Sequence, residues 1–314
     1  MSGVENPVSP FEVKRAADLH ETPPEARWLV ETLWADGGVG VIGGTPKSCK
    51  SWLGLELATA VATGTPVFGE YRVPQPGPTL VFLAEDDLAC VRDRLDSLAS
   101  HRGLSLDDLD VHVITAPTVR IDIEHDLRRL AKTVSIIEPR FLLLDPFVRL
   151  HQVDENNASD ISQLLGHLRT LQRHYDTAVC VVHHTRKSSS RQQRGQALRG
   201  SGDLHAWGDS NLYLTWTKDG LELSVEHRAA PAPDPVFVGL DDGSHPHLAL
   251  VEPDETEPRK LTDRILDDLR SLSEPITRTH LRARLAVNNA RLGDALTELE
   301  ELGRIQRTQQ GWRI

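Results

Sequence analysis

A glycine-rich stretch, GGTPKSCKS at residues 43–51, carries the residue types that surround a phosphate chain. It fits the pattern G-x-x-x-x-G-K-[ST], except that Cys49 stands where the second glycine belongs. In such a loop the backbone N–H groups point at the phosphates, the lysine reaches the β- and γ-phosphates and the hydroxyl ligates Mg²⁺. The residues that we expect to bind the nucleotide are Gly43, Gly44, Thr45, Pro46, Lys47, Ser48, Cys49, Lys50, Ser51 and Trp52.

The residues around this loop predict the strand and the helix that must position it. Residues 39–42 form a short apolar run, which favours a buried strand, and residues 52–63 place leucine, alanine and valine at helical spacing. The alternative is a glycine-rich turn before an ordinary helix. The motifs further along the chain favour the phosphate loop.

A second apolar strand, predicted over residues 79–83, ends in the acidic run Glu85, Asp86 and Asp87. Ligands of open α/β sheets bind at the carboxyl ends of the strands. Glu85 is therefore the candidate general base that orients a water molecule for attack on a γ-phosphate. The alternative is that the acidic residues only cap the helix predicted from Leu88, and both roles are compatible with Asp87 as the cap.

Another strand, predicted over residues 140–145, ends at Asp145 and is followed by proline. An apolar strand that ends in aspartate suits a carboxylate that holds Mg²⁺ directly or through water. Asp145 and Ser51 are the candidate metal ligands. The alternative is a buried strand followed by an Asp-Pro turn.

A fourth apolar strand delivers His183 and His184 to its end, and a basic segment follows. Either histidine could report on the γ-phosphate, or one could be a satisfied core residue and the other a surface residue. Residues 186–199 hold no acidic side chain, which suits the phosphates of single-stranded nucleic acid, although a solvated loop is the simpler reading. The cationic side chains are Arg186, Lys187, Arg191, Arg194 and Arg199.

The last part of the chain reads as a hairpin, a linker and a small helical unit. Asp219-Gly220 lies between two alternating runs, a β-hairpin signature, and an acidic, proline-containing segment covers residues 253–258. Three helices and a hairpin over residues 259–314 predict a winged helix, in which Arg282, Arg284 and Arg291 would contact duplex DNA. The alternative is a protein-docking domain that recruits a partner.

Length, composition and net charge limit the classes of protein that the chain can belong to. The chain has 314 residues, 39% hydrophobic and 26% charged, as expected for a folded protein, and no apolar run of membrane-spanning length. The net charge of −11 argues against a globally basic nucleic-acid binder and leaves local patches possible. Three scattered cysteines and no signal peptide indicate the cytoplasm. We expect a loose arm (1–25), an α/β domain (26–252), a linker (253–258) and a C-terminal domain (259–314).

Taken together, residues 27–250 resemble RecA-like P-loop ATPases, specifically the plasmid-type hexameric replicative helicases. The resemblance rests on Gly44-x4-Cys49-Lys50-Ser51, Ala84-Glu85-Asp86, Leu142-Leu143-Leu144-Asp145, Val182-His183-His184-Thr185 and Leu198-Arg199-Gly200-Ser201. It implies a mainly parallel sheet flanked by helices, a homo-oligomeric ring of six subunits and ATP with Mg²⁺ bound between neighbours. It also implies a single-stranded DNA partner and no membrane.

Two departures from the family pattern matter. The first is Cys49, whose thiol we expect to have a lowered pKa and to be oxidisable, because it lies beside Lys50 and a helix N-terminus. The second is the arginine finger, since Asp209 occupies the place where the helicases carry it. Arg228 is the first candidate for a finger supplied to the neighbouring subunit, and Arg199 is the second.

The sequence therefore predicts an ATPase that couples hydrolysis to single-stranded DNA as a helicase-like motor. The alternatives are an ATP-dependent DNA-binding switch or regulator of a mobile element, and an assembly scaffold that binds no nucleic acid.

Overall fold

The computed structural model describes residues 11, 13–18, 27–184, 202–252, 261–270, 275–285, 289–308 and 311–313. The predicted linker 253–258 and the basic segment 186–199 lie outside these residues. The chain divides into two compact units, one of residues 1–214, 223–235 and 240–249, the other of residues 215–222, 236–239 and 250–314. Each unit is described by itself.

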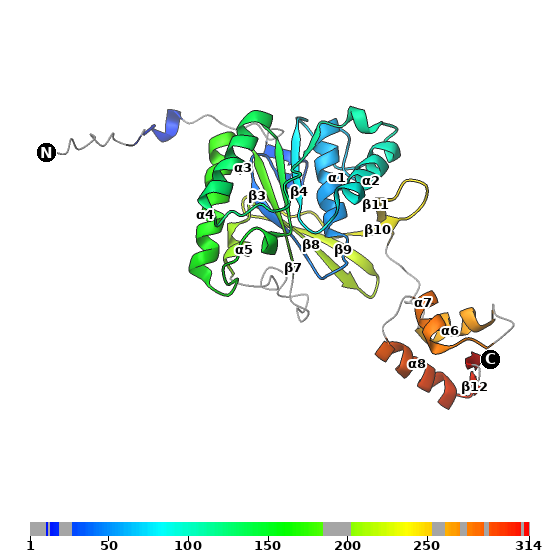
Figure 1. The fold of residues 1–314 in the computed structure, drawn as a ribbon. Coiled ribbons are helices and arrows are strands. Elements are labelled where there is room, and N and C mark those ends of the chain that lie inside the picture. The colour runs from blue at the N-terminus through cyan, green and yellow to red at the C-terminus, as the bar shows by residue number, and fades with distance from the viewer. Residues whose placement is uncertain are drawn as a thin grey trace. The chain divides into compact units, whose positions relative to one another are not determined.

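A nine-stranded sheet is built from strands between residues 39 and 251 (Figure 1), with the order β11-β10-β9-β8-β3-β7-β6-β4-β5. The pairs β8–β3, β3–β7, β7–β6, β6–β4 and β4–β5 are parallel. The strands are β3 (Val39–Gly44), β4 (Thr79–Leu83), β5 (Val111–Val113), β6 (Phe141–Asp145), β7 (Ala178–His184), β8 (Ser210–Thr217), β9 (Gly220–His227), β10 (Val236–Asp241) and β11 (His247–Val251). A small separate sheet pairs β1 (Trp28–Val30) with β2 (Trp34–Ala35).

Helices cover both faces of this sheet, which explains why the central strands read as continuous apolar runs. Helices α1 (Lys50–Thr63) and α2 (Leu88–His101) lie on one face, and α3 (Glu124–Ile137) and α4 (Ala158–Tyr175) lie on the other (Figure 1). Alternate residues of one strand serve the two faces. In β6, Leu142 and Leu144 belong to the core that includes α3 and α4, whereas Leu143 packs against Gly54 of α1.

The parallel central strands bring four chain positions to one edge of the sheet. Strands β3, β4, β6 and β7 end at Gly44, Leu83, Asp145 and His184, and every neighbouring pair among them is parallel. The predicted bounds of β4 are confirmed, and β6 ends at Asp145 as expected. The short helix α5 (Asp203–Trp207) was not predicted.

The C-terminal part of the smaller unit, from residue 261, contains three helices followed by a hairpin, in the predicted order. These elements are α6 (Leu261–Arg270), α7 (Arg278–Leu285), α8 (Asn289–Glu301), β12 (Gln306–Thr308) and β13 (Gly311–Arg313). Their core contains Ile265, Leu281 and Leu296 from the three helices. Ile276 and Trp312 exchange backbone hydrogen bonds of 3.0 and 2.9 Å, which tie the segment before α7 to the hairpin.

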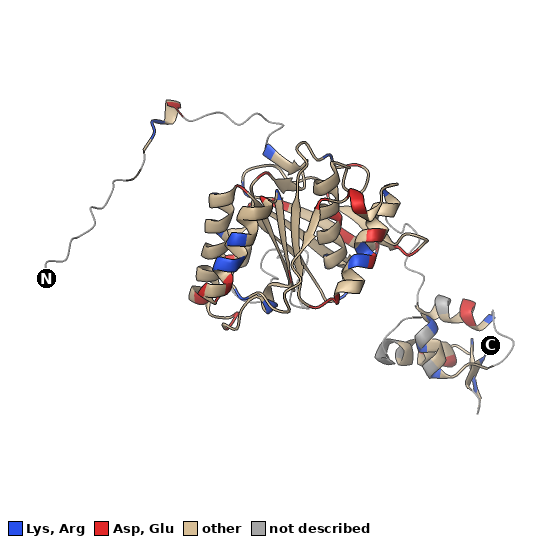
Figure 2. Cartoon of the chain, turned by 45° about the horizontal axis from the view of Figure 1, so that its top comes forward, with Lys and Arg blue, Asp and Glu red and all other residues tan. Residues whose placement is uncertain are grey.

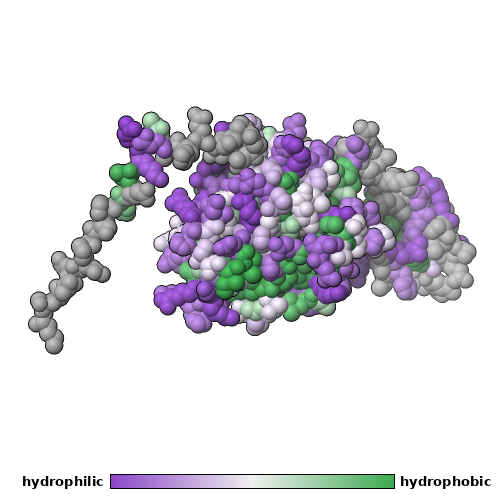
Figure 3. Space-filling model, turned by 90° about the horizontal axis from the view of Figure 1, so that it is seen from above, coloured by the Kyte–Doolittle hydropathy of each residue, from purple (hydrophilic) through white to green (hydrophobic). Residues whose placement is uncertain are grey.

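Charged residues of both signs lie on the outer faces of the helices that flank the sheet (Figure 2). The face seen from above is mostly hydrophilic, with an apolar patch among the polar side chains (Figure 3). Among the helices that the structure describes, none has the length and apolar character needed to span a membrane.

Candidate nucleotide-binding site

The loop between β3 and α1 has the compact geometry that a phosphate loop needs. Lys47 and Cys49 adopt left-handed backbone conformations, with φ angles of 64° and 59°. The Ser48 hydroxyl donates a hydrogen bond to the Thr45 carbonyl at 2.8 Å. A Cβ atom on Gly44 would lie 2.5 Å from the Ser48 Oγ, so glycine is required there. The motif usually has a glycine at position 49, because glycine adopts a left-handed backbone conformation without steric cost. Cys49 adopts that conformation in this chain.

The Lys50 ammonium lies where the strand ends meet. It is 6% exposed and donates a hydrogen bond to the Thr45 carbonyl at 2.8 Å. Burial lowers the pKa of Lys50, and the negative charges of Asp145 and Glu85 act in the opposite direction. The predicted phosphate lysine, metal carboxylate and general base are therefore close enough in the folded chain to interact electrostatically.

Asp145 has the environment of a cation ligand. Its burial raises the pKa of the carboxyl to about 6, although a hydrogen bond with the Ser51 side chain and the charge of Lys50 act against this. The buried Oδ2 atom has no hydrogen-bond partner among the residues that the structure describes. A hydroxyl beside a buried carboxylate oxygen fits Mg²⁺, which typically takes one or two protein ligands together with substrate phosphates.

The three acidic residues after β4 have separate partners. Glu85 Oε1 accepts a hydrogen bond from Arg149 Nε at 2.8 Å. Asp86 accepts two bonds from the Arg94 guanidinium, at 2.7 and 3.1 Å. The Asp87 carboxylate caps α2 by accepting from the Cys90 N–H at 2.7 Å, so the predicted cap is confirmed.

The two histidines of β7 lie beside the phosphate loop. In the parallel pairing of β3 and β7, Gly43 is opposite His183 and Gly44 is opposite His184. His183 is 2% exposed, with its Nδ1 atom 3.9 Å from Glu155 Oε1. Their register is compatible with a phosphate sensor, which remains a prediction. The basic side chains Arg186, Lys187, Arg191, Arg194 and Arg199 lie outside the described residues.

A cleft of about 660 Å³ opens between α2 and the loop that joins β10 to β11. Trp52 and Arg94 line it, and the Arg94 guanidinium carbon lies 5.5 Å from the Trp52 ring centroid. Trp52 belongs to the first turn of α1, directly after the phosphate loop. An aromatic ring and a planar cation at this place suit a flat heterocycle that carries a phosphate chain.

The loop between β10 and β11 contacts α2 through a hydrogen bond and a pair of stacked rings. The Ser97 hydroxyl donates to the Pro246 carbonyl at 2.7 Å, and the rings of His101 and His247 stack with centroids 3.4 Å apart. Burial lowers the pKa of His101; His247 and Arg102 lower it further, whereas Glu56 and Asp241 raise it. The stack therefore favours neutral imidazole.

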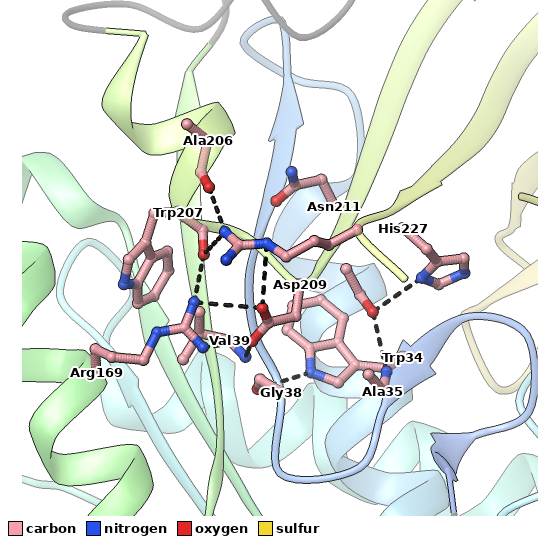
Figure 4. A network of polar contacts seen from close by, with 12 residues as sticks. Trp34, Ala35, Gly38, Val39, Arg169, Ala206, Trp207, Asp209, Asn211 and His227 are labelled. Atoms are coloured by element: carbon pink, nitrogen blue, oxygen red, sulfur yellow. Dashed lines mark hydrogen bonds and ion pairs between the residues drawn. The ribbon is translucent and has the colours of Figure 1, made fainter. Parts of the chain in front are cut away.

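A polar network around Asp209 lies at the other end of β3, beside Val39 (Figure 4), and Arg228 contacts two of its residues. Arg228 Nε lies 3.5 Å from Asp209 Oδ1, and the side chain donates to the Trp207 carbonyl at 3.1 Å. Asp209 also accepts from the Val39 N–H at 3.1 Å and from Arg169. Five residues of extended strand, roughly 17 Å, separate Val39 from the end of β3. Arg228 thus lies far from the phosphate loop of its own chain and could act only on a neighbour.

The arginines predicted to bind duplex DNA lie in the smaller unit. Arg282 is exposed, and the Arg284 guanidinium binds Asp268 with bonds between 2.7 and 3.0 Å. Arg291 belongs to α8, and its side chain is not among those that the structure describes. Sequence reasoning missed the exposed hairpin arginines Arg307 and Arg313, which lie on opposite faces of the hairpin because Arg307 pairs with Trp312 and Arg313 pairs with Gln306.

The expected lowering of the Cys49 pKa is wrong in direction. Burial raises the pKa of this thiol, and the opposing effect of the Lys50 charge is smaller. The oxidation of Cys49 stays a prediction. The structure also reveals two arginines that sequence reasoning missed, Arg94, which binds Asp86 eight residues earlier, and Arg149, which binds Glu85 of a distant segment.

Comparison with known proteins agrees with this geometry. The family model described as "AAA domain" matches residues 7–190, and the chain therefore belongs to this family of P-loop ATPases. A RadB recombinase structure aligns with a TM-score of 0.51 and 17% identity, covering 69% of this chain and 92% of that one. A DnaB-like replicative helicase aligns with a TM-score of 0.53 and 14% identity, covering 69% of this chain and 59% of that one. A KaiC-like protein from Pyrococcus horikoshii OT3 aligns at 13% identity with a TM-score of 0.48, covering 71% of this chain and 94% of that one. The likeness to the recombinase and the helicase identifies the fold as RecA-like.

Proposed function

We propose that this protein is an ATP-hydrolysing, helicase-like motor that assembles as a homo-oligomeric ring of six subunits in the cytoplasm and couples hydrolysis to single-stranded DNA. The observation that carries the proposal is the meeting of Lys50, Asp145 and Glu85 at one edge of the parallel sheet. These groups supply the cation, the metal ligand and the base that phosphoryl transfer to water requires.

Hydrolysis proceeds in this proposal by in-line attack of water on the γ-phosphate. Lys50 and the loop N–H groups bind the phosphates, and Ser51 and Asp145 hold Mg²⁺, which supplies charge stabilisation when bound. Glu85 accepts a hydrogen bond from the attacking water and orients it. His183 or His184, beside the loop glycines, responds to the loss of the γ-phosphate.

The cleft at Trp52 and Arg94 is the proposed site of the adenine base. The guanidinium is fixed by its two hydrogen bonds to Asp86, so the stacking surface is already formed. Because Asp86 also interacts electrostatically with Asp145, the base site and the metal site share one acidic neighbour.

A neighbouring subunit completes the site in this proposal. Arg228 is the first candidate finger, since it is half-exposed and lies too far from the loop of its own chain. Its contacts with Asp209 and Trp207 place it in a defined position before any neighbour arrives. Arg199 is the second candidate.

DNA contacts are proposed for two regions. The basic segment 186–199 follows His184 directly and would bind single-stranded phosphates, with Arg186, Lys187, Arg191, Arg194 and Arg199 as contacts. Residues 259–314 are proposed to be a winged helix that binds duplex DNA or a replication partner. This segment carries eleven Lys and Arg against eight Asp and Glu, so it is basic although the whole chain has a net charge of −11.

A second candidate function is an ATP-dependent DNA-binding switch without unwinding activity. The observation in its favour is the structured C-terminal unit, whose exposed arginines could bind DNA without a motor. A forked DNA substrate separates the two candidates, because only a motor displaces the strand.

The test is ATPase activity with and without single-stranded DNA, for the wild type, Lys50→Ala and Glu85→Gln. We expect stimulation by DNA in the wild type, loss of activity in Lys50→Ala, and retained ATP binding with turnover reduced at least about 100-fold in Glu85→Gln. DNA retention should weaken steeply as salt is raised. A wild type that hydrolyses ATP without any response to DNA, and retains no DNA at low salt, would contradict the proposal and favour the scaffold.

A further inference from the structure

The candidate base Glu85 is bound to a cation from another segment. Arg149 ends the short 3-10 helix Phe147–Arg149, which directly follows Asp145 and Pro146. Its Nε donates to Glu85 Oε1 at 2.8 Å, and the side chains of Arg149 and Glu85 are 61% and 48% exposed. The pair joins the end of β4 to the segment after β6.

This pair limits what Glu85 can do. The oxygen that accepts from the guanidinium has a lone pair engaged there, and the carboxylate is turned toward Arg149. A carboxylate that acts as general base must accept the hydrogen bond of the water instead. The arrangement seen here is therefore a resting one for the proposed reaction.

The neighbouring carboxylates show that the Glu85 pair is the one suited to release. Asp86 is held by two bonds from Arg94, and both of those side chains are less than a quarter exposed. Asp87 caps α2 and is part of the helix start. Glu85 is held at one oxygen in a pair open to water, and exposed ion pairs contribute little free energy.

The position of Arg149 links this pair to the end of β7. Phe147, two residues earlier in the same 3-10 helix, is fully buried, and its ring centroid lies 6.0 Å from that of His183. The Arg149 N–H donates to the Pro146 carbonyl at 3.0 Å, so its backbone is fixed to the same short turn. A displacement at His183 would reach Arg149 through Phe147 and the rigid turn.

We propose that Arg149 is a positioning residue that holds Glu85 away from the attacking water and releases it when the strand ends rearrange around the nucleotide. The inference rests on the proposed function, because it takes Glu85 as the base. It adds a control element to that function: hydrolysis in the absence of a partner is slowed by the Glu85–Arg149 ion pair.

The experiment compares basal ATPase activity of the full chain in the wild type, Arg149→Gln and Arg149→Lys. Release of an exposed ion pair should raise the basal kcat of Arg149→Gln roughly two- to fivefold, with an unchanged KM for ATP. Arg149→Lys keeps the cation and should return kcat toward the wild-type value. The matched control is Arg72→Gln, which breaks the exposed Arg72–Glu31 pair far from the loop and should leave kcat unchanged.

A basal kcat of Arg149→Gln equal to or below that of the wild type overturns the inference. An equal rise in the basal kcat of Arg72→Gln also overturns it, since the rise would then follow from the loss of any exposed ion pair rather than from the release of Glu85. Glu85→Gln separates this failure from failure of the proposed function. If Glu85→Gln abolishes turnover while Arg149→Gln changes nothing, the base assignment stands and only the control element fails.

Discussion

Replacing Cys49 tests how the phosphate loop keeps its shape without its second glycine. Cys49 has φ 59° and ψ 22°, a left-handed conformation that L-residues adopt at a cost. Two substitutions separate the backbone effect from the loss of the thiol. Cys49→Ala removes the sulfur and keeps the Cβ atom, whereas Cys49→Gly removes both.

The expected difference follows from two opposing terms. A left-handed backbone costs an L-residue roughly 1–2 kcal/mol, and glycine escapes that cost. Glycine also gives the unfolded chain more freedom, which lowers stability by about 0.4–1 kcal/mol. Cys49→Gly should therefore have a free energy of unfolding roughly 0.5–1 kcal/mol above that of Cys49→Ala.

Urea unfolding followed by tryptophan fluorescence measures this difference, because five of the six tryptophans lie at or before residue 216. With a slope of about 3 kcal/mol/M, the midpoint of Cys49→Gly should lie about 0.2–0.3 M above that of Cys49→Ala. Equal midpoints, or a higher midpoint for Cys49→Ala, would refute the assigned left-handed conformation and with it the described shape of the loop.

Two further predictions concern the sheet and the loop that borders the cleft. Because a Cβ on Gly40 would lie 1.6 Å from the Ser210 carbonyl oxygen, Gly40→Ala should lower the free energy of unfolding by at least about 3 kcal/mol, whereas Gly166→Ala, with open space at its Cβ, should not lower it. The folded state lowers the pKa of His101, so the unfolded chain binds the proton first and the stack with His247 should lose stability as the pH falls below about 6.5. The hydrogen-exchange protection factors of residues 241–248, which are corrected for the pH dependence of intrinsic exchange, should then fall between pH 7.5 and 5.5 in the wild type more than in His101→Phe, which stacks without a proton.

The motifs could be predicted from the sequence because each depends on a local pattern. The apolar runs before Gly44, Glu85 and Asp145 define strands that are buried on both faces, and the glycine or carboxylate after each run marks the edge where ligands bind. Parallel pairing then brings these residues together, as the structure shows for Lys50 and Asp145. The order of the strands was not predicted, since pairing between distant segments leaves no local signal.

Tertiary contacts explain most of the features that sequence reasoning missed. Arg149 and Glu85 are 64 positions apart, so no local pattern pairs them. Arg94 and Asp86 are only eight positions apart, and this local pair was overlooked. The pKa of Cys49 was predicted in the wrong direction because proximity to Lys50 can be read from the sequence, whereas burial depends on tertiary packing. The roles of segment 186–199 and of Arg228 remain predictions.

The most direct test of the account is calorimetric titration of the full chain with ATP, with and without Mg²⁺, in the wild type and in Lys50→Ala and Asp145→Asn. We predict tight, Mg²⁺-dependent binding by the wild type, a loss of at least about tenfold in affinity for Lys50→Ala, and loss of the Mg²⁺ dependence for Asp145→Asn. A wild type that does not bind ATP, or a Lys50→Ala variant that binds it as tightly as the wild type, would contradict the claim that these strand ends form one nucleotide site.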